Sequence, residues 1–340
     1  MRVLPKSLVI AATRNEGPYL LEWIAWQKML GFERVLILHN DCTDHSPQML
    51  RLLERAGWVY QKRHFPKPNQ PPKTSAHRTA MRHHAVADAE WAFVCDVDEF
   101  LVVHVGDKSV AALADVIAPD NYGMCVHWRV FGTGGAQEWR DGLVHRMFTR
   151  SGPEDARQNS CFKTLVKNPT MFRVLNPHGP QKWLGGDRFK WWWNEADRKF
   201  ILADGSHYAP YHPSERPKVS TEHNRITNQM AQVNHYALQS VEKFNLKRPH
   251  LSSAAHIERY NDDFFRRFDR NEEENLSALT YEAEFDRVYA EICAVPGVMR
   301  LHHLCCADLL ERSAALRDAD PLEDPRYLRH RDLAASLPKH

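Results

Sequence analysis

The chain has 340 residues, of which 43% are hydrophobic and 26% charged, and its formal net charge is +2. This composition is typical of a globular protein, and so small a charge excludes a general affinity for nucleic acid. The length suffices for one large α/β domain with an appendage, and no apolar run approaches the roughly 20 residues of a membrane span.

The first 105 residues alternate between short apolar segments and longer amphipathic ones. We predict strands at 8–12, 34–38, 58–63 and from Trp91 onward, separated by helices at 18–31, 46–57 and 74–89. Pro18 suits the first turn of its helix, and Ser46 is the expected cap of the next one. This alternation predicts an α/β fold with a mostly parallel, doubly wound sheet flanked by helices.

Polar residues follow the first, second and fourth predicted strands, so they should meet at one rim of the sheet, where α/β proteins bind ligands. The fourth strand runs into Asp96, Asp98 and Glu99. Carboxylates this close repel each other, and a bound dication would relieve the repulsion. Solvated acids at a strand end are the alternative. Lysine or arginine partners for the aspartate pair would contradict the argument for a metal.

The expected rim has no glycine-rich phosphate loop, because both G-x-G-x-x-G and G-x-x-x-x-G-K-[ST] are absent from the chain. A metal on Asp96 and Asp98 is the substitute that we expect to hold the phosphates of a nucleotide. The seven cysteines show neither a C-x-x-C pair nor zinc-ligand spacing. We therefore expect reduced thiols in a cytoplasmic protein, and no apolar signal region follows Met1.

Several motifs occur in a characteristic order. They read T-R-N-E-G-P-Y-L-L-E-W, H-N-D-C-T-D-H-S, D-V-D-E-F-L, W-R-V-F-G-T-G-G, C-F-K-T-L-V-K, N-P-H-G-P and N-H-Y-A-L-Q-S-V-E-K-F-N-L-K. Over residues 6–250 the chain resembles family 2 type glycosyltransferases, and more narrowly a bacterial branch related to family 92. The resemblance implies a GT-A fold, a nucleoside-diphosphate sugar donor with a UDP-sugar as first choice, and Mn²⁺ or Mg²⁺.

The resemblance also assigns residues to the donor and metal sites. The donor-binding residues that it implies are Thr13, Asn15, Glu16, Asn40, Asp44, Arg82, Asp96, Val97, Arg146, Lys163 and His178. The implied metal ligands are Asp96, Asp98 and His235, with His178 as the second choice of histidine. Structural roles compete with several of these assignments: Glu16 and Asp44 also suit helix N-termini, and Arg82 also suits a solvated helix face.

In the second half, a predicted strand at 123–130 leads into a glycine-rich turn. Transfer to an acceptor hydroxyl needs a general base, and the candidates are Glu138, Asp155 and Asp187, with Glu138 preferred because it follows that turn. Lys163 or Arg146 should stabilise the leaving group. The tryptophans Trp183, Trp191, Trp192 and Trp193 are acceptor candidates, although a core strand or a subunit contact would also account for them.

The chain becomes helical from about residue 261. We expect a GT-A domain at 1–250, made of a nucleotide-sugar half at 1–105 and an acceptor half at 106–250, then a helical appendage at 251–320 and a polar tail at 321–340. The expected function is metal-dependent, inverting transfer of a sugar, with a hexose as first choice, to a saccharide acceptor in surface polysaccharide synthesis. A nucleotidyltransferase and a non-catalytic nucleotide-sugar or saccharide-binding module are the alternatives. Peripheral contact with the inner face of the membrane and a homodimer are both compatible with the sequence.

Overall fold

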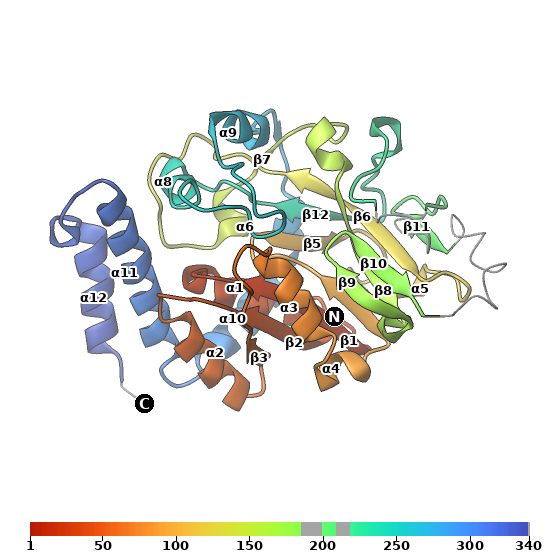
Figure 1. The fold of residues 1–340 in the computed structure, drawn as a ribbon, viewed down its shortest axis with the longest axis horizontal. Coiled ribbons are helices and arrows are strands. Elements are labelled where there is room, and N and C mark those ends of the chain that lie inside the picture. The colour runs from red at the N-terminus through yellow and green to blue at the C-terminus, as the bar shows by residue number, and fades with distance from the viewer. Residues whose placement is uncertain (185–198, 209–217, 339–340) are drawn as a thin grey trace.

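The structure is a computed structural model that describes residues 1–184, 199–208 and 218–338. Within these residues a nine-stranded sheet has the order β3-β2-β1-β4-β8-β6-β12-β5, and β11 pairs with β6 outside this path (Figure 1). The strands are β1 (Leu4–Thr13), β2 (Phe32–His39), β3 (Tyr60–Arg63), β4 (Trp91–Val94), β5 (Glu99–Val103), β6 (Gly123–Val130), β8 (Phe162–Lys167), β11 (Phe200–Leu202) and β12 (Ala231–His235).

The first four strands of this order are parallel, and β6 is parallel to both β11 and β12. Only three pairings of the described sheet are antiparallel, namely β4 with β8, β8 with β6, and β12 with β5. The predicted mostly parallel α/β sheet is therefore confirmed. Two short ribbons lie beside it, β9 (Phe172–Asn176) with β10 (Gly179–Trp183), and β7 (Arg150–Ser151) with β13 (Glu273–Glu274).

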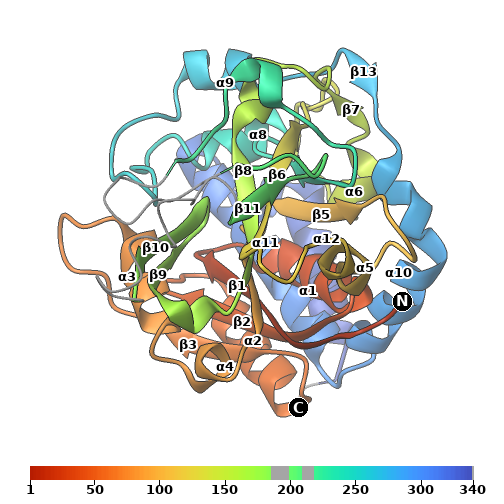
Figure 2. The ribbon, with the colours of Figure 1, turned by 90° about the vertical axis from the view of Figure 1, so that its right-hand side faces the viewer.

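Helices flank the sheet, as Figures 1 and 2 show. The longer ones are α1 (Gly17–Met29), α2 (Ser46–Arg55), α3 (Pro72–Ala80), α10 (Glu282–Cys293), α11 (Val298–Leu316) and α12 (Pro325–Ser336). The shorter ones are α4 (His84–Ala87), α5 (Val110–Asp115), α6 (Val144–Met147), α8 (Val241–Asn245) and α9 (Asp262–Phe268).

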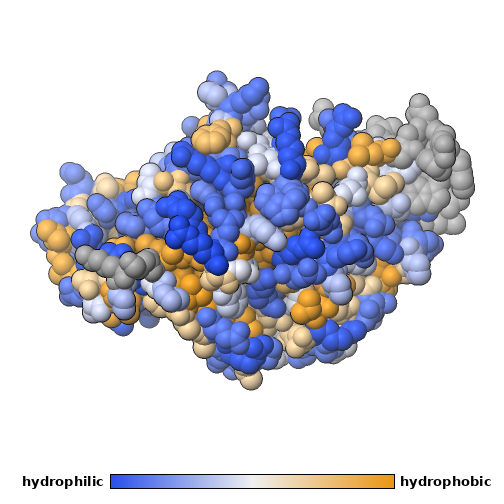
Figure 3. All heavy atoms as spheres, turned by 90° about the horizontal axis from the view of Figure 1, so that it is seen from below, coloured by the Kyte–Doolittle hydropathy of each residue, from blue (hydrophilic) through white to orange (hydrophobic). Residues whose placement is uncertain are grey.

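The two faces of the sheet bury separate sets of apolar side chains. In β1, Val9 and Ala11 belong to a large cluster with α1, α10 and α11, whereas Leu8 and Ile10 belong to a smaller cluster with α3 and α4. This division follows from the alternation of side chains along a strand. Hydrophilic residues cover most of the face in Figure 3, with small hydrophobic groups between them.

Two local predictions need correction. The helix expected at 74–89 is interrupted, because His83 has an extended backbone and its ring accepts a hydrogen bond from the backbone N–H of Ala85, which starts a new helix, α4. Ser46 is not the cap of α2 but its first residue, and His45 occupies the cap position. The nearby carboxylate of Asp44 accepts hydrogen bonds from both the backbone and the hydroxyl of Ser46.

The predicted C-terminal helices are present, but they share the core of the α/β domain. The indole ring of Trp26 in α1 lies 5.2 Å from the ring of Tyr281 and 5.9 Å from that of Phe285 in α10. The expected polar tail is also corrected, because Pro325–Ser336 forms α12 against α11. Asp324 caps this helix, and Ala334 is buried. Among the described residues, none of the helices is both long enough and apolar enough to cross a membrane.

Candidate active site

The loops that follow β1 and β2 are fastened to each other at the carboxyl rim of the sheet. The side-chain oxygen of Asn15 accepts hydrogen bonds from the backbone N–H groups of Thr43, at 2.7 Å, and Asp44, at 3.3 Å. Asp44 in turn accepts one from the N–H of Gly17 at 3.1 Å, where α1 begins. Asn15 has a φ of 57°, a conformation that asparagine tolerates better than most residues. In the free protein these two predicted donor residues therefore fix the loops.

The third element of the rim is the turn between β4 and β5. β4 ends at Val94 and β5 begins at Glu99, so Asp96 and Asp98 flank a tight turn rather than share a strand face. The backbone N–H of Glu99 donates to the carbonyl of Asp96 at 3.0 Å. The N–H of Asp96 donates to the Glu99 carboxylate at 2.8 Å, and Val97 is buried between the aspartates. The turn is thus held by its own hydrogen bonds.

Three lysines neutralise the two aspartates. Lys73 Nζ lies 2.5 Å from one carboxylate oxygen of Asp96, and Lys163 Nζ lies 3.1 Å from the other. Lys247 Nζ lies 3.1 Å from an oxygen of Asp98. The three lysines come from α3, β8 and the turn after α8, so folding gathers them from distant parts of the chain.

Lys163 also forms an ion pair with Glu99, the residue that follows the turn. Its side chain is 1% exposed, and Nζ lies 2.7 Å from the carboxylate of the fully buried Glu99. Burial opposes the charge of Lys163, but Asp96 and Glu99 outweigh it and raise the pKa of the lysine. Burial also raises the pKa of Glu99 to about 7. Lys163 and Glu99 thus form a buried ion pair next to the aspartate turn.

The lysines also set the charge states of the aspartates. Burial alone would raise the pKa of Asp96, but Lys163 and Lys73 hold it well below its usual range. In the same way, burial opposes ionisation of Asp98, and Lys247 with His235 keeps its pKa low. Both carboxylates are therefore ionised at neutral pH, each beside at least one ammonium group.

His235 stands at the end of β12, next to the turn. Its Nε2 lies 3.9 Å from a carboxylate oxygen of Asp98, which is too far for a hydrogen bond. Its Nδ1 is buried and has no hydrogen-bond partner among the described residues. Burial lowers the pKa of His235 to about 4, so the ring is neutral at pH 7. It is close to Asp98, as the sequence predicts for a shared metal site.

The contacts of Asp96 and Asp98 differ from those that we expect of two metal ligands. The prediction that Asp96 and Asp98 repel each other without a metal is wrong. Lysines contact three of their four carboxylate oxygens and relieve the repulsion. Within the described residues, the ligand atoms of Asp96, Asp98 and His235 are not gathered within 4.8 Å of one another. As arranged, the residues do not form a ready-made cation site. Mn²⁺ or Mg²⁺ at this pair remains a prediction from the family resemblance.

A second ion pair extends the rim toward α8. Lys243 Nζ lies 2.9 Å from the carboxylate of Glu16 and 4.7 Å from the ring centre of Tyr19. Sequence reasoning did not select Lys73, Lys243 or Lys247. Lys243 and Lys247 are four residues apart, a spacing that puts two side chains on the same face of a helix, and they follow the N-H-Y motif. This spacing could have indicated that both lysines face the site. For Lys73 the sequence held no signal, because it lies beside a proline-rich loop.

The other donor candidates are more dispersed. Arg146 pairs with Asp286 at 2.7 Å and Glu282 at 3.6 Å on α10, so this contact draws its guanidinium toward α10 and not toward the aspartates. Arg82 is exposed after α3. The remaining three are Thr13, Asn40 and His178. Thr13 is buried and its hydroxyl has no partner among the described residues, Asn40 donates to Asp41 at 2.9 Å, and His178 Nδ1 lies 2.9 Å from the carbonyl of Phe162.

The structure describes two of the three predicted general bases. Glu138 is exposed on a loop that hydrogen-bonds to the N-terminus of α8 through its neighbours Gln137 and Trp139. Asp155 is exposed in the loop after β7. Asp187 lies outside the described residues, as do the acceptor candidates Trp191, Trp192 and Trp193, whereas Trp183 ends β10. The neighbours of Glu138 thus attach its loop to the first turn of α8, the helix that carries Lys243.

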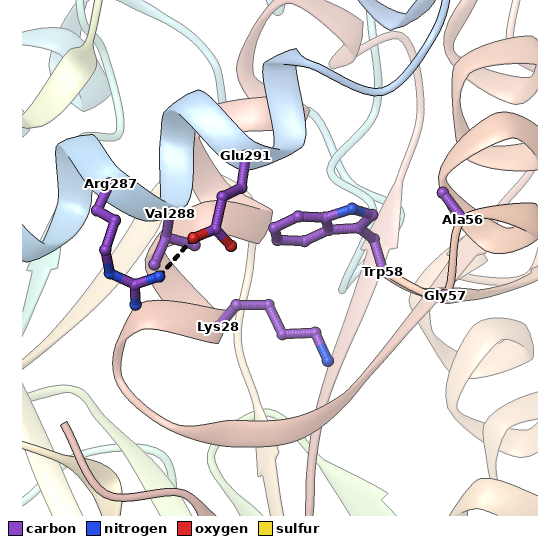
Figure 4. A pocket seen from close by; sticks show the side chains of 7 residues that line it. All are labelled: Lys28, Ala56, Gly57, Trp58, Arg287, Val288 and Glu291. Atoms are coloured by element: carbon purple, nitrogen blue, oxygen red, sulfur yellow. Dashed lines mark hydrogen bonds and ion pairs between the residues drawn. The ribbon is translucent and has the colours of Figure 1, made fainter.

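The surface also has a shallow pocket of about 320 Å³, which Figure 4 shows between α10 and the loop after α2. Lys28, at the end of α1, and Trp58, just before β3, line it. A helix that follows a parallel strand starts at the carboxyl rim and ends at the opposite edge. The pocket therefore lies across the sheet from the lysine–aspartate cluster and plays no part in the site described above.

The sequence was compared with known families. Residues 14–268 match the model of glycosyltransferase family 92. The chain belongs to this family. It is therefore a glycosyltransferase, and its mostly parallel sheet with flanking helices is the arrangement expected of a GT-A domain. The match spans the aspartate turn and all three lysines that contact it.

Among solved structures, TarS 1–349 of S. aureus is 11% identical, with 96% of this chain and 87% of that chain covered and a TM-score of 0.35. Its complex with UDP-GlcNAc gives 14% identity, 96% and 90% coverage and a TM-score of 0.32. HddC from Yersinia pseudotuberculosis gives 12%, 47% and 68%, and 0.26. Likenesses this weak carry no inference for the family 92 chain. A search of curated proteins found no match.

Proposed function

We propose that this glycosyltransferase takes a sugar from a nucleoside-diphosphate donor, with a UDP-sugar as first choice, and transfers it to a saccharide acceptor. The observation that carries the proposal is the set of three lysines around Asp96 and Asp98 at the carboxyl rim. Crevices at this rim are the usual ligand sites of α/β sheets, and ammonium groups bind phosphates. The cluster thus supplies ammonium groups at the rim where a diphosphate would bind, although carboxylates pair with them in the free protein.

Two of the lysines can change partner when the donor binds. The side chains of Lys73 and Lys247 are 19% and 20% exposed, whereas Lys163 is almost completely buried. We infer that Lys73 and Lys247 turn toward the diphosphate oxygens and that Lys163 remains paired with Asp96 and Glu99. Positive groups held beside the leaving diphosphate stabilise the charge that develops as the glycosidic bond breaks.

The same movement bears on the metal. If Lys73 and Lys247 left the carboxylates, Asp96 and Asp98 would lose partners and would be the residues to hold a dication, which would add positive charge beside the diphosphate. Binding of Mn²⁺ or Mg²⁺ at Asp96, Asp98 and His235 is therefore proposed to require the donor. In the free protein the lysines should exclude the ion.

The acceptor hydroxyl must lose a proton during the transfer. We propose direct displacement with inversion, which needs a carboxylate to take the acceptor hydroxyl proton. Glu138 is the preferred base because its loop is hydrogen-bonded to α8, whose Lys243 pairs with Glu16 at the rim. Asp155 and Asp187 are the other candidates. A hexose donor and an acceptor in surface polysaccharide synthesis remain proposals from the family resemblance.

The donor proposal is tested by thermal unfolding with UDP, GDP, ADP, CDP and dTDP, each with and without Mn²⁺. We expect one nucleoside diphosphate to raise the midpoint without metal and to raise it further with Mn²⁺, while Mn²⁺ alone has no effect that depends on Asp98. Release of that nucleoside diphosphate from its sugar conjugates then identifies the donor. If none of the five stabilises the protein with or without metal, the proposal is wrong.

Variants separate binding at the aspartate turn from general effects of charge. Asp98→Asn should lower turnover at least a hundredfold and remove the response to Mn²⁺, whereas Asp115→Asn, which changes an exposed acid paired with Arg2, should leave both unchanged. Unchanged circular dichroism would show that Asp98→Asn folds. Equal activity of the two variants would contradict a role for Asp98.

The alternatives give different results in the same assays. A nucleotidyltransferase would join a nucleoside triphosphate to a sugar phosphate and release pyrophosphate, and a binding module would respond to nucleotide without any turnover. Release of a nucleoside diphosphate from a sugar donor excludes both.

A further inference from the structure

A second polar cluster lies on the C-terminal helices, and the proposed transfer reaction does not use it. Asp141, on the loop that also carries Glu138, meets His302 and Cys306 of α11. The two helix residues are buried, with exposed fractions of 4% for His302 and 0% for Cys306. Asp141 is partly exposed, which leaves one side of the group open to solvent.

Two distances within this cluster match the spacing of zinc ligands. His302 Nε2 lies 3.2 Å from a carboxylate oxygen of Asp141 and 3.6 Å from the sulfur of Cys306. The possible ligand atoms of the three residues all lie within 4.8 Å of one another. Zinc–ligand bonds in a tetrahedral site imply separations of about 3.4 Å between nitrogen and oxygen and about 3.6 Å between nitrogen and sulfur. Both measured distances are close to these values.

The fold also explains why these three residues are held in place. His302 and Cys306 are four residues apart on α11, which puts both on one face of the helix. The loop with Asp141 is anchored nearby, because Glu242 accepts a hydrogen bond from the N–H of Trp139 and another from the hydroxyl of Ser313 on α11. The cluster is therefore built on a buried helix face with a fastened loop opposite.

The imidazole of His302 has few other polar contacts. Its Nδ1 is buried and has no hydrogen-bond partner among the described residues, and its Nε2 contacts Asp141 and Cys306. A carboxylate, an imidazole and a thiol form a mixed set of O, N and S ligands, which zinc accepts better than magnesium or calcium does.

We propose that Asp141, His302 and Cys306 bind a zinc ion, with water at the fourth position on the exposed side of Asp141. On binding, the Cys306 thiol gives up its proton to solvent and the thiolate coordinates the ion, while Nε2 of neutral His302 and an oxygen of Asp141 complete the protein ligands. The ion joins α11 to the loop of Glu138 and so fixes the loop beside α8.

A neighbouring group makes the test more demanding. Nδ1 of His303 lies 3.2 Å from Nδ1 of His330 on α12, and these two residues form another candidate metal group with Asp141. An ion bound there would use no thiolate. Cobalt distinguishes the two groups, because a thiolate bound to Co²⁺ gives a charge-transfer absorption in the near ultraviolet that imidazole and carboxylate do not.

The experiment uses the full chain, stripped with a chelator and then dialysed against zinc or cobalt. We expect about one tightly held ion per chain that is lost in Cys306→Ala, thiolate-to-cobalt absorption, and a raised unfolding midpoint with zinc. A wild-type protein that retains no zinc, or that binds cobalt without the thiolate band, overturns the proposal whether or not any variant folds.

Variants then assign the ligands. Cys306→Ala and His302→Ala should abolish the cobalt band and lower zinc content at least tenfold. Cys305→Ala is the matched control, since Cys305 is the adjacent residue, is equally buried and contacts Gly17 instead. Loss of the ion in His330→Ala but not in Cys306→Ala would place it in the neighbouring group and overturn the proposal. Because unfolding and metal content need no sugar donor, their outcome is independent of the proposed transfer reaction.

Discussion

At the scale of single residues, Lys163 has the most demanding position in the site. A lysine that is 1% exposed is tolerable only if its charge is compensated, and Asp96 and Glu99 supply that compensation. The sequence already indicates the problem, because this lysine interrupts a β-prone apolar segment. It does not indicate the solution, since we expected the donor diphosphate to compensate this charge and the structure places protein carboxylates there.

Removing one partner of this buried pair should be costly. We predict that Lys163→Met lowers the free energy of unfolding by about 3–5 kcal/mol, because Glu99 remains buried without its ammonium partner. Adding Glu99→Gln should recover part of the loss, with a coupling of at least about 1 kcal/mol. Urea unfolding of the single and double variants measures both quantities.

The control for this cycle lies in the same strand. Lys167 is half-buried and donates to the carbonyl of Pro119 at 3.2 Å, so Lys167→Met should cost less than about 1 kcal/mol. If Lys163→Met costs no more than this control, or if the effects of Lys163→Met and Glu99→Gln simply add, then the two side chains are not coupled.

At the scale of elements, one carboxylate connects α12 to both α8 and α11. Glu242, in the first turn of α8, accepts two hydrogen bonds from Arg326 at 2.8 and 3.1 Å. It also accepts one from Ser313 of α11 at 2.6 Å. This contact joins α8 to the two C-terminal helices, and it contributes to the packing of a segment that resembles a polar tail.

Loss of this arginine should loosen α12 selectively. We predict that Arg326→Ala raises amide hydrogen exchange at least tenfold in Pro325–Ser336, because the helix is short and buries few side chains. Exchange in the central strands should stay unchanged. Hydrogen exchange followed by mass spectrometry resolves the two regions.

Arg331→Ala provides the comparison, since Arg331 is exposed on the same helix and has no ion pair among the described contacts. It should leave exchange in α12 within about twofold of the wild type. Similar exchange in both variants would mean that Glu242 does not hold the helix.

At the scale of the whole molecule, the C-terminal helices complete the core of the α/β domain. Phe285 and Ile292 of α10 are fully buried in the cluster that contains β1 and α1. Each such side chain contributes about 1.5–3 kcal/mol through burial, and a domain is stable by only about 5–15 kcal/mol. The domain should therefore depend on residues beyond those that match the family model, 14–268.

A chain that ends at residue 280 tests this dependence. We predict that it is insoluble or unfolds without a cooperative transition, because α1 would expose the face that Tyr281 and Phe285 cover. A chain that ends at residue 320 lacks only α12 and its short lead-in, and it should unfold cooperatively at a lower midpoint. Circular dichroism during urea unfolding compares them, and a cooperative transition in the shorter chain would show that residues 1–280 fold independently.

The sequence by itself determined the order of strands and helices in the first 105 residues, the rim where polar loops meet and the position of the aspartate turn. These features follow from local periodicity, caps and turns, which neighbouring residues specify. Even there, its limits were local exceptions such as the break at His83 between α3 and α4.

Only the tertiary structure decided what surrounds those features. The lysines beside Asp96 and Asp98 come from three separate elements, and Asp141 meets His302 across 161 positions of the chain. No local pattern encodes such contacts, because electrostatic and ligand geometry depends on distance in space. For the same physical reason, the spacing of the cysteines in the sequence did not indicate the proposed zinc site. In the structure, one buried thiol lies beside an imidazole and a carboxylate.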